Sequence, residues 1–529
     1  MWPFDSLRSL RAGRHIKAAR RSPSRSLPAV MRARYDAAQT TAENARHWAM
    51  ADALSADGAA SPDVRRKLRE RSRYEDANNS YAKGIVLTIA NDCIGTGPRL
   101  QMLTDDADTN RRVEAAFAEW AEAVDLAGKL RTMRMAKATD GEAFAVFSGN
   151  PTLNMPVMLD VQLIEADRVA SPVSACGYAV TGPDTCRGEA QRSQVDGIVL
   201  DAWGNPQTYT VLRQHPGDPL RGDYPTAAWK TQFDLVPADA VVHWFRGDRP
   251  GQHRGIPEIT PALPLFAQLR RYTLAVIAAA ETAADFAAVL FTDAPANGEA
   301  QALEPMDVVD LEKRMATVLP DGWRLGQVEA QQPATGYAEF KREILNEIAR
   351  CLNLPYNIAA CNSSGYNYAS GRLDHQTYFK SIRIEQAHLA ETVLDRILAA
   401  WIREAKLVLG FRLEAAGGRN GNGTAPTASS LEPPAYPPHQ WFFDGTEHVD
   451  PAKEANAQAT RLSSNTTTLA IEYARQGRDW ETELRQRAKE EALKAELGLM
   501  VPAAPQPAED DEPEDTEEAD TDVEQDQAA

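Results

Sequence analysis

The side chains that most often carry chemistry are present in this chain, but their spacing matches no known catalytic motif. His243 and His253 are ten residues apart across an expected loop, which is a weak signal for a metal site. Glu165 and Asp167 could form a general acid–base pair. In a chain this rich in acids, a solvated strand end or a salt bridge to Arg168 is the better interpretation.

The sequence also lacks the motifs of the large enzyme families. It has no GxxxxGK[ST] phosphate loop, no GxSxG and no HExxH. Gly95 and Gly97 follow an expected helix and not a strand, so they do not form a dinucleotide fingerprint. The sequence therefore predicts no enzyme, no catalytic residue, no metal and no cofactor.

The cysteines likewise indicate no structural metal site. The chain has five, none in a CxxC pair: Cys93, Cys176, Cys186, Cys351 and Cys361. This pattern indicates a reducing compartment and argues against a disulfide framework or a structural zinc. We expect each cysteine to be a small buried hydrophobic residue.

Charge is distributed unevenly along the 529 residues, which carry a net charge of −18. Residues 1–34 hold nine Arg or Lys and one acid, whereas residues 509–526 hold twelve acids and no base. The rest of the chain carries −14. A protein that binds nucleic acid tightly has a basic body, because its affinity comes from neutralising phosphates. We therefore expect that this chain does not hold nucleic acid tightly.

No stretch of the sequence is expected to span a membrane, and the composition fits a globular protein. The most apolar segment, Leu274–Phe291, is interrupted by Glu281 and Asp285, which are costly at the centre of a bilayer. Hydrophobic residues make up 43% of the chain, enough to bury sizeable cores. The length suggests about three domains or one elongated subunit of several parts.

The hydrophobic period predicts an α+β fold, because it changes from helical to alternating and back. Expected helices cover about 35–54, 62–94, 108–124 and 125–139, and the Asn78–Asn79 pair suggests a break in the second. Expected strands are 143–147, 156–164, 197–200, 208–212 and 236–245.

After residue 258 the pattern becomes helical again. It predicts a helix at 259–285, a strand at 286–292, a helix at 306–317, a strand near 323–328, a helix at 337–353 and a helix at 372–409. The Asn-, Ser- and Gly-rich segment 357–371 is expected to be a mobile loop. Residues 416–440 have the composition of a linker, and about 450–497 are expected to be helical. The Arg-rich start should be flexible and the acidic tail disordered.

Short motifs spread from about Arg34 to Ala488 resemble the lambda-type family of bacteriophage portal proteins. The most specific is Val242–Phe245 followed by Arg249–Pro257. The others are Ala77–Gly84, Asn91–Gly97, Asp140–Phe144, Leu163–Val169, Asn367–Arg372 and Val449–Ala455. No single motif is decisive, but their order and number are.

The resemblance implies a function as a structural channel in the virion. Such proteins form a ring, usually of about twelve subunits, at one capsid vertex, and double-stranded DNA passes through the ring during packaging and ejection. The terminase large subunit docks on the ring, and a head-completion or adaptor protein later replaces it. The ring would be assembled in the host cytoplasm, without a membrane. The alternatives are another head–tail connector or adaptor ring, although adaptors are typically much shorter, and an unrecognised acidic hydrolase.

The organisation of the family maps onto the expected elements. The implied parts are a basic arm at 1–34, a wing at 35–258, a stem helix at 259–285, a clip at 286–336, a second stem helix at 337–353, a channel loop at 357–371, a wing helix at 372–412, a linker at 413–444, a helical crown at 445–497 and an acidic tail at 498–529. The arm would bind scaffold or major capsid protein, or be solvated with no partner; we weigh these equally.

The resemblance also suggests which residues meet DNA. The candidate loop residues are Asn357, Asn362, Ser363, Ser364, Tyr366, Asn367 and Tyr368, whose neutral polar groups can make weak, exchangeable contacts. Glu281 and Asp285 are ordinary surface charges on structural grounds alone; if they line the stem, they would keep DNA centred. Twelve copies would carry −216, a field that opposes adhesion of DNA.

Overall fold

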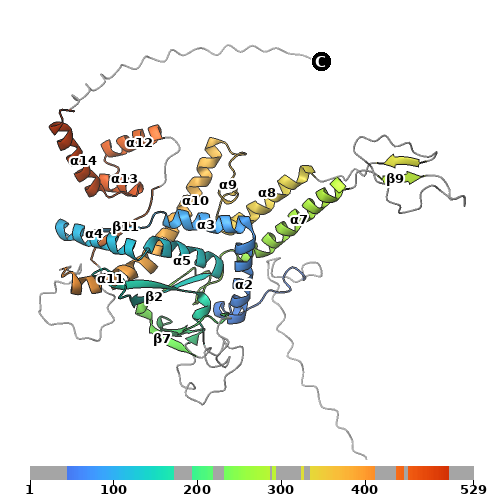
Figure 1. Ribbon diagram of the computed structural model, residues 1–529, viewed down its shortest axis with the longest axis horizontal. Helices are drawn as coiled ribbons and strands as arrows, with labels where there is room; N and C mark the ends of the chain where they lie inside the picture. Colours follow the sequence, from blue (N-terminus) through green and yellow to red (C-terminus); the bar gives the residue numbers. More distant parts are fainter. Residues whose placement is uncertain are drawn as a thin grey trace, which may run out of the picture. The chain divides into compact units, whose positions relative to one another are not determined.

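The computed structural model describes residues 45–171, 194–218, 232–285, 289–292, 323–326, 334–411, 437–445 and 451–499. The chain divides into two compact units, 1–55 and 56–529, and the elements below all belong to the second. The fold mixes helices with small antiparallel sheets (Figure 1). Within the described residues, no helix has the length and apolarity needed to cross a membrane.

The described helices fall into three stretches of the chain. The first stretch has α1 (Ala56–Ala59), α2 (Pro62–Asn78), α3 (Ser80–Ile94), α4 (Ala107–Ala123) and α5 (Leu126–Asp140). The second has α7 (Leu263–Asp285), α8 (Ala334–Arg350), α9 (Tyr356–Ala359), α10 (Tyr368–Leu389) and α11 (Asp395–Val408). The third has α12 (Pro451–Ser463), α13 (Leu469–Arg475) and α14 (Trp480–Glu496).

The described strands pair in four antiparallel sheets. A three-stranded sheet has the order β3 (Leu159–Ile164), β2 (Glu142–Gly149), β8 (Val241–Phe245). A four-stranded sheet has the order β4 (Gln194–Val195), β5 (Ile198–Leu200), β6 (Pro206–Leu212), β7 (Phe233–Pro237). The two-stranded sheets pair β1 (Arg99–Met102) with β11 (His439–Phe442), and β9 (Val289–Thr292) with β10 (Trp323–Gly326).

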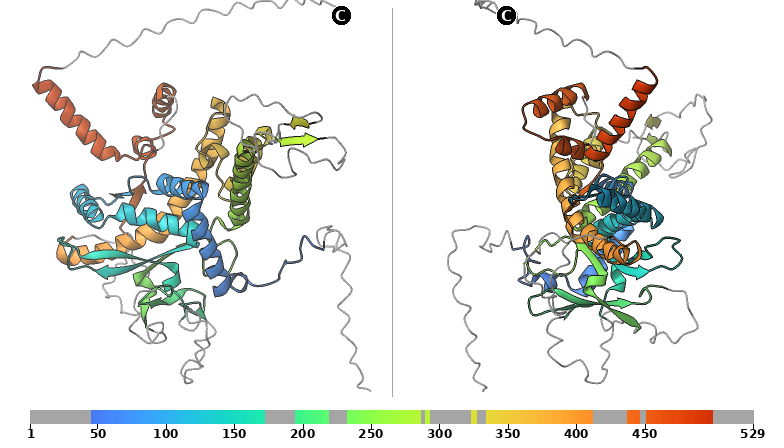
Figure 2. Two further views of the ribbon diagram at one scale, coloured as in Figure 1. Left: turned by 45° about the vertical axis from the view of Figure 1, so that its right-hand side comes forward. Right: turned by 90° about the vertical axis from the view of Figure 1, so that its left-hand side faces the viewer.

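One core lies between α4, α5, the three-stranded sheet and α11. Helix α5 crosses a face of that sheet (Figures 1 and 2). Trp120, Trp244 and Trp401 are buried in this core, and Phe117 packs between Trp120 and Trp401 at ring distances of 5.3 and 5.4 Å. The indole N–H of Trp120 donates to the carbonyl of Leu159 (2.8 Å), so its polar group is satisfied inside the core.

A second core joins the helices on either side of residues 289–326. Its buried residues come from α3, the start of α7, α8, α9 and α10. Phe266, Ile348 and Tyr378 are among its largest members. Helices α7 and α8 run side by side, with Tyr272 packed against Tyr337 and Phe340 (Figure 1).

The helix expected over 62–94 is broken at Asn79. Asn79 has extended dihedrals (φ −122°, ψ 115°), and its side-chain oxygen accepts from the backbone N–H groups of Tyr81 and Ala82. Asn is a favoured N-cap because it satisfies N–H groups that have no partner within the helix. The break suggested by the Asn78–Asn79 pair is therefore confirmed.

Four other expectations about elements are wrong. Described residues 45–55 form turns and irregular chain and not the second half of a helix. The single strand expected at 236–245 is split by a 3₁₀ turn at Ala238–Ala240, which sends β7 and β8 into different sheets. Residues 357–371 include α9 and the start of α10. Residues 439–442, expected in a linker, form β11.

The long helix expected over 372–409 is confirmed, with one irregularity. Helices α10 and α11 are joined by a π-helical turn at Ala390–Leu394. The strands β9 and β10 and the helical segment 451–497 also agree with expectation. The helix expected at 306–317 lies outside the described residues, as do the arm at 1–34 and the tail from 500 onward.

Candidate DNA-facing loop and the ion pairs around it

The loop predicted to face DNA is shorter in the structure than in the sequence analysis. It runs from residue 360 to 367, between α9 and α10. Asn357 lies in α9, is buried, and uses its backbone carbonyl to accept from the N–H of Asn362 (2.9 Å). Asn357 therefore stabilises the loop through this backbone hydrogen bond and is not one of its exposed residues. Tyr368 is the first residue of α10.

The exposed residues of the loop are small and uncharged. Asn362, Ser363 and Ser364 are exposed, and Tyr366 is half-buried. The side-chain oxygen of Asn362 accepts from the N–H of Ser364 (2.9 Å), which orders a turn. Burial, followed by the nearby charge of Asp374, raises the pKa of Tyr366, so its hydroxyl remains protonated.

Asn367 has a structural role that the sequence analysis missed. Its side-chain oxygen accepts from the N–H of Ser370 (2.8 Å), which makes it the N-cap of α10. The amide N–H₂ groups of Asn362 and Asn367 have no partner among the described residues. Such groups can donate to phosphate oxygens without attracting them strongly.

The predicted stem charges are not brought next to this loop. Glu281 is exposed near the end of α7. Asp285 is the last residue of α7, and its side chain lies outside the described residues. Their place along a channel remains a prediction.

The most connected carboxylate of the described chain is Glu142, on β2. It is fully buried and accepts from Arg254 (2.6 and 2.9 Å), from Arg69 (3.3 Å), from His243 (3.1 Å) and from the backbone N–H of Gly255 (3.0 Å). Arg254 also donates to the carbonyls of Val169 and Asp196. These bonds tie α2, β2, β8 and the segment before α7 together.

The charges in this cluster decide how its members titrate. Burial raises the pKa of Glu142, but the attraction of Arg254 and the hydrogen bond from His243 outweigh it, and the net pKa lies well below its usual value. Burial lowers the pKa of His243. A neutral His243 that donates from Nε2 to Glu142 and accepts at Nδ1 from Tyr209 (3.4 Å) fits this arrangement. His243 is therefore a core residue and not a metal ligand.

A second buried ion-pair cluster joins α5 to the segment before α7 and to α10. Arg134 donates to Glu258 (3.0 Å) and lies 3.5 Å from Glu385, which also pairs with Lys137. The ammonium of Lys137 lies 4.6 Å from the centre of the Trp244 ring. Burial lowers the pKa of Arg134, but Glu258 and Glu385 more than offset this and raise it.

Glu165 and Asp167 lie near His215, but they do not form an acid–base pair. Glu165 is exposed, as expected for a solvated strand end, whereas Asp167 pairs not with Arg168 but with Arg69 (3.0 Å) and Arg73 (2.8 Å) of α2. His215 Nε2 lies 2.9 Å from Glu165, while its Nδ1 accepts from the N–H of Gly217 (3.0 Å).

The cluster of Glu165, Asp167 and His215 is the candidate metal-ligand group among the described residues. With Nδ1 accepting, Nε2 carries the proton of a neutral imidazole and has no lone pair for a metal. The two arginines beside Asp167 already balance the acids. This cluster is therefore better described as an ion-pair network.

The remaining candidates for chemistry are also structural. His253 Nδ1 lies 2.8 Å from Asp57, so it holds α1 and not an ion. Cys93 is buried, and burial raises its pKa to about 12, as expected for an inert thiol. Cys361 is exposed, so the expectation that every cysteine is buried is wrong. Cys176 and Cys186 lie outside the described residues.

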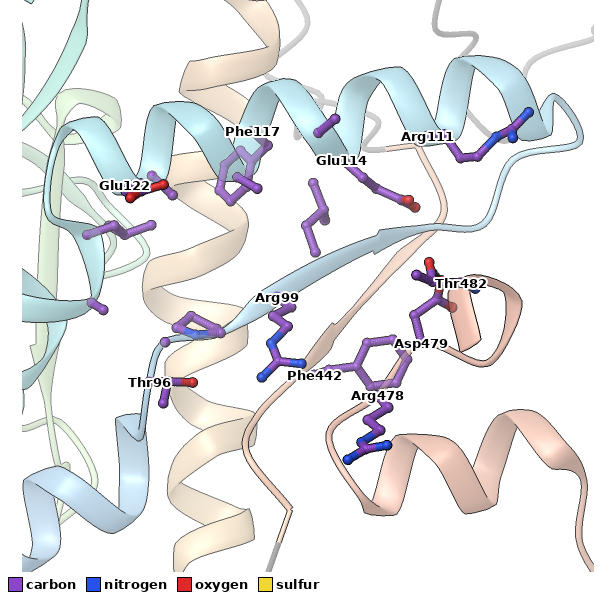
Figure 3. Close-up of a pocket in the computed structure, with 18 of the residues that line it drawn as sticks. Thr96, Arg99, Arg111, Glu114, Phe117, Glu122, Phe442, Arg478, Asp479 and Thr482 are labelled. Atoms are coloured by element: carbon purple, nitrogen blue, oxygen red, sulfur yellow. Dashed lines mark hydrogen bonds between the residues drawn. The ribbon is translucent and has the colours of Figure 1, made fainter. Parts of the chain in front are cut away.

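A pocket of about 690 Å³ lies between α4, β1, β11 and the start of α14 (Figure 3). Its polar lining consists of arginines, acids and two threonines, including Arg99, Glu114, Arg478 and Asp479, and it contains no His, Cys or Lys. Arg99 donates to the carbonyl of Gly477 (2.9 Å), and Gln101 to Asp479, so these side chains fasten the C-terminal helices to β1. This contact could not be predicted from the sequence, because the residues that form it are 378 positions apart.

Comparison with known proteins agrees with the resemblance seen in the motifs. Residues 42–386 match the family model described as phage portal protein, lambda family. The probable portal protein of Halomonas phage phiHAP-1 is 24% identical over 485 residues, and the match covers 86% of each chain.

Two solved structures are similar over most of their length. A chain in the neck of an empty GTA particle, in C6 symmetry, has a TM-score of 0.46 at 14% identity and covers 77% of this chain and 92% of its own. A chain in the neck of a native GTA particle, in C12 symmetry, has a TM-score of 0.44 at 13% identity and covers 79% and 94%. The family match spans well over half of the chain, and the chain therefore belongs to the lambda family of phage portal proteins.

Proposed function

We propose that this portal protein forms a closed ring, with about twelve copies, through which double-stranded DNA enters and leaves a phage capsid. The observation that carries the proposal is the family match over 42–386, which includes α7, α8 and the 360–367 loop. The role is structural and not enzymatic. The polar clusters of the described residues support this view, because their acids are bound by arginines and lysines and do not face a reactive cavity.

The parts of the ring follow from the order of the elements. We assign α7 and residues 337–353, which include most of α8, to the stem, residues 286–336 to the clip, and α12–α14 to the crown. The clip would meet the terminase large subunit during packaging and a head-completion or adaptor protein afterwards. Residues 1–34 would reach scaffold or capsid protein.

The 360–367 loop is the best candidate for contact with DNA. It is exposed, it lies between the second stem helix and the long α10–α11 helix, and its side chains carry no charge. DNA that moves through a channel must break each contact at every step, so weak hydrogen bonds suit this role better than ion pairs. Glu281, on the stem helix α7, would repel phosphates and keep the duplex away from the wall.

Imaging of the purified chain tests the ring directly. Negative-stain electron microscopy should show top views with about twelve-fold symmetry and a hole wide enough for duplex DNA. Compact monomers or dimers across a range of salt concentrations would contradict the proposed function.

The loop needs a separate test that spares its structural residues. Asn362, Ser363, Ser364 and Tyr366 can be replaced by Gly or Ser, with Asn357 and Asn367 left in place because they support and cap the neighbouring helices. We expect rings of normal size with reduced DNA packaging or retention in particles. The matched control is Ser463→Gly with Ser464→Gly, at the exposed C-terminal end of α12. Normal packaging by the loop variant would remove the loop from the function.

A further inference from the structure

Helix α10 exposes a basic stripe on a protein that is acidic as a whole. The stripe consists of Arg372, Lys380 and Arg383, all exposed. At 3.6 residues per turn these three lie within an arc of about 80°. None of them has a salt-bridge or hydrogen-bond partner among the described residues. Two exposed apolar residues, Leu373 (64%) and Ile384 (64%), flank the stripe on one side.

Helix α8 exposes the opposite charge in the same arrangement. Its acidic stripe consists of Glu339, Glu343 and Glu347, which also lie within an arc of about 80°. Within the described part of the chain, the partner of this stripe is Arg342, 3.3 Å from Glu343 on the solvent side. Phe340, 48% exposed, flanks the acidic stripe as Leu373 and Ile384 flank the basic one.

The two stripes cannot satisfy each other within one chain. Leu345 and Ile348 of α8, and Tyr378 and Ile382 of α10, bury the opposite faces of their helices in the same core. Both stripes therefore face away from that core, and no ion pair joins them among the described residues. Each is about 12–17 Å long, since a helix rises 1.5 Å per residue, so one stripe can lie along the other over its whole length.

We infer that the acidic stripe of α8 in one copy docks on the basic stripe of α10 in the next copy. A contact between two different surfaces of identical subunits is heterologous, and repetition around an axis closes a ring. The flanking apolar residues provide the area removed from water, and the charges fix the register and exclude like-charged pairings. This inference rests on the proposed ring and names the surfaces that build it.

A second copy explains these surfaces better than DNA does. Phosphates would match the basic stripe, but they would leave the acidic stripe of α8 without a counter-charge and would not cover Leu373, Ile384 or the exposed part of Phe340, whose ring also touches Tyr272. The two stripes agree in number of charges and in the side on which their apolar flank lies, and the shorter acidic stripe fits within the length of the basic one. DNA binding at α10 is accordingly an alternative outcome of the experiment.

Charge reversal of each stripe tests the docking. One variant carries E339K, E343K and E347K, and the other carries R372E, K380E and R383E. Lys and Glu are both good helix formers, and Glu near the start of α10 suits the helix dipole, so both variants should fold. We expect each variant alone to lose about tenfold or more of its ring fraction at low salt, because like charges now meet across the interface.

Mixing the two variants gives the decisive result. A ring that alternates the two variants places an acidic stripe against a basic one at every interface, so an equimolar mixture should recover rings by native mass spectrometry. Matched control variants are E119K with E122K on α4, and R487E with K489E on α14, at exposed positions away from both stripes. Circular dichroism spectra equal to that of the native chain confirm that each variant is folded.

The outcomes separate this inference from the function on which it rests. A native chain that forms no ring contradicts the proposed function, and this inference with it. Variants that form rings alone, or variants that lose rings and do not recover them on mixing, overturn the docking while leaving the function in place. Intact rings of the R372E, K380E and R383E variant that fail to retain DNA would assign the basic stripe to DNA and also overturn the docking.

Discussion

At the scale of single residues, Glu142 connects more of the chain than any other described carboxylate. It is buried in β2 and receives hydrogen bonds from three side chains that belong to α2, β8 and the segment before α7. A buried ion pair is weak support for stability as a whole, because both charges lose their hydration. Removal of one partner is nevertheless costly, because the remaining charge is left buried without compensation.

Replacement of Glu142 by Gln should therefore destabilise the protein strongly. Gln keeps the shape of the side chain but leaves Arg254 buried without its main counter-charge, which costs about 3–5 kcal/mol. The measurement is the thermal melting of the protein by circular dichroism. The control is Glu122→Gln on the exposed face of α4, which should leave the melting temperature unchanged. Equal melting of both variants would show that the Glu142 cluster contributes little.

His243 should make the stability of the protein fall as the solution becomes acidic. Burial lowers its pKa in the folded protein below the ordinary value near 6.5, so the unfolded chain takes up a proton first as pH falls. Its contribution is present above pH 6.5 and is lost between that value and the lower pKa of the folded state, at no more than about 1.4 kcal/mol per pH unit.

The contribution of His243 can be isolated from those of two other histidines. Burial lowers the pKa of His388 and acts in the same direction as at His243, whereas the pKa of His439 is raised by Asp395 against the effect of burial. The difference between the native chain and the His243→Gln variant removes the contributions of His388 and His439, because both histidines are present in each protein. We expect the melting temperature to fall less in the variant between pH 7.5 and 5.5, because Gln can still donate to Glu142 but does not titrate. Parallel pH profiles would show that His243 is not a titrating group.

These residue contacts could not be predicted from the sequence. His243 and Glu142 are 101 residues apart, and Asp167 pairs with arginines almost a hundred residues away on α2. Local spacing identifies ligands that lie on one element, whereas these clusters form where three elements meet. The buried position of Asn357 and the capping role of Asn367 were missed for the related reason that α9 is only one turn long.

At the scale of elements, the local sequence predicted the structure better than it predicted contacts between single residues. Long amphipathic segments were predicted to within a few residues, including α4, α5, α7 and the α10–α11 helix. The predictions failed where the structure depends on strand pairing or on a short break within an element. β11 has only four residues and exists because β1 pairs with it, from Arg99↔Phe442 to Met102↔His439. A composition that indicates a linker cannot reveal such a partner.

The break between α2 and α3 should depend on one side chain. Asn79→Ala removes the oxygen that accepts from Tyr81 and Ala82 and should lower stability by about 1 kcal/mol. Asn78→Ala is a matched control one residue earlier, because Asn78 is exposed in the last turn of α2 and bonds only the Tyr74 carbonyl. Thermal melting of both variants checks the prediction, and an equal loss in the two would assign the effect to helix propensity and not to the cap.

At the scale of the whole molecule, the distribution of charge distinguishes a channel for DNA from a protein that binds DNA tightly. The described basic side chains are largely used in ion pairs within the fold, such as those of Arg69, Arg134 and Arg254. The chain keeps a net charge of −18, although residues 1–34 hold nine basic residues against one acid. A ring of such chains should guide duplex DNA by repulsion and not by adhesion.

Salt dependence of DNA binding tests this view. Each phosphate neutralised by a protein contributes a slope of about −0.9 to the logarithm of affinity against the logarithm of salt concentration. We expect assembled rings to bind a fluorescent duplex weakly, with the salt slope of a protein that neutralises only a few phosphates. Deletion of residues 1–34 should remove most of this weak binding. Deletion of residues 509–526, which removes twelve acids, should strengthen binding in the same assay. If the salt slope stays steep after residues 1–34 are deleted, the rest of the chain must bind DNA through another surface. That result would contradict a channel that guides DNA by repulsion.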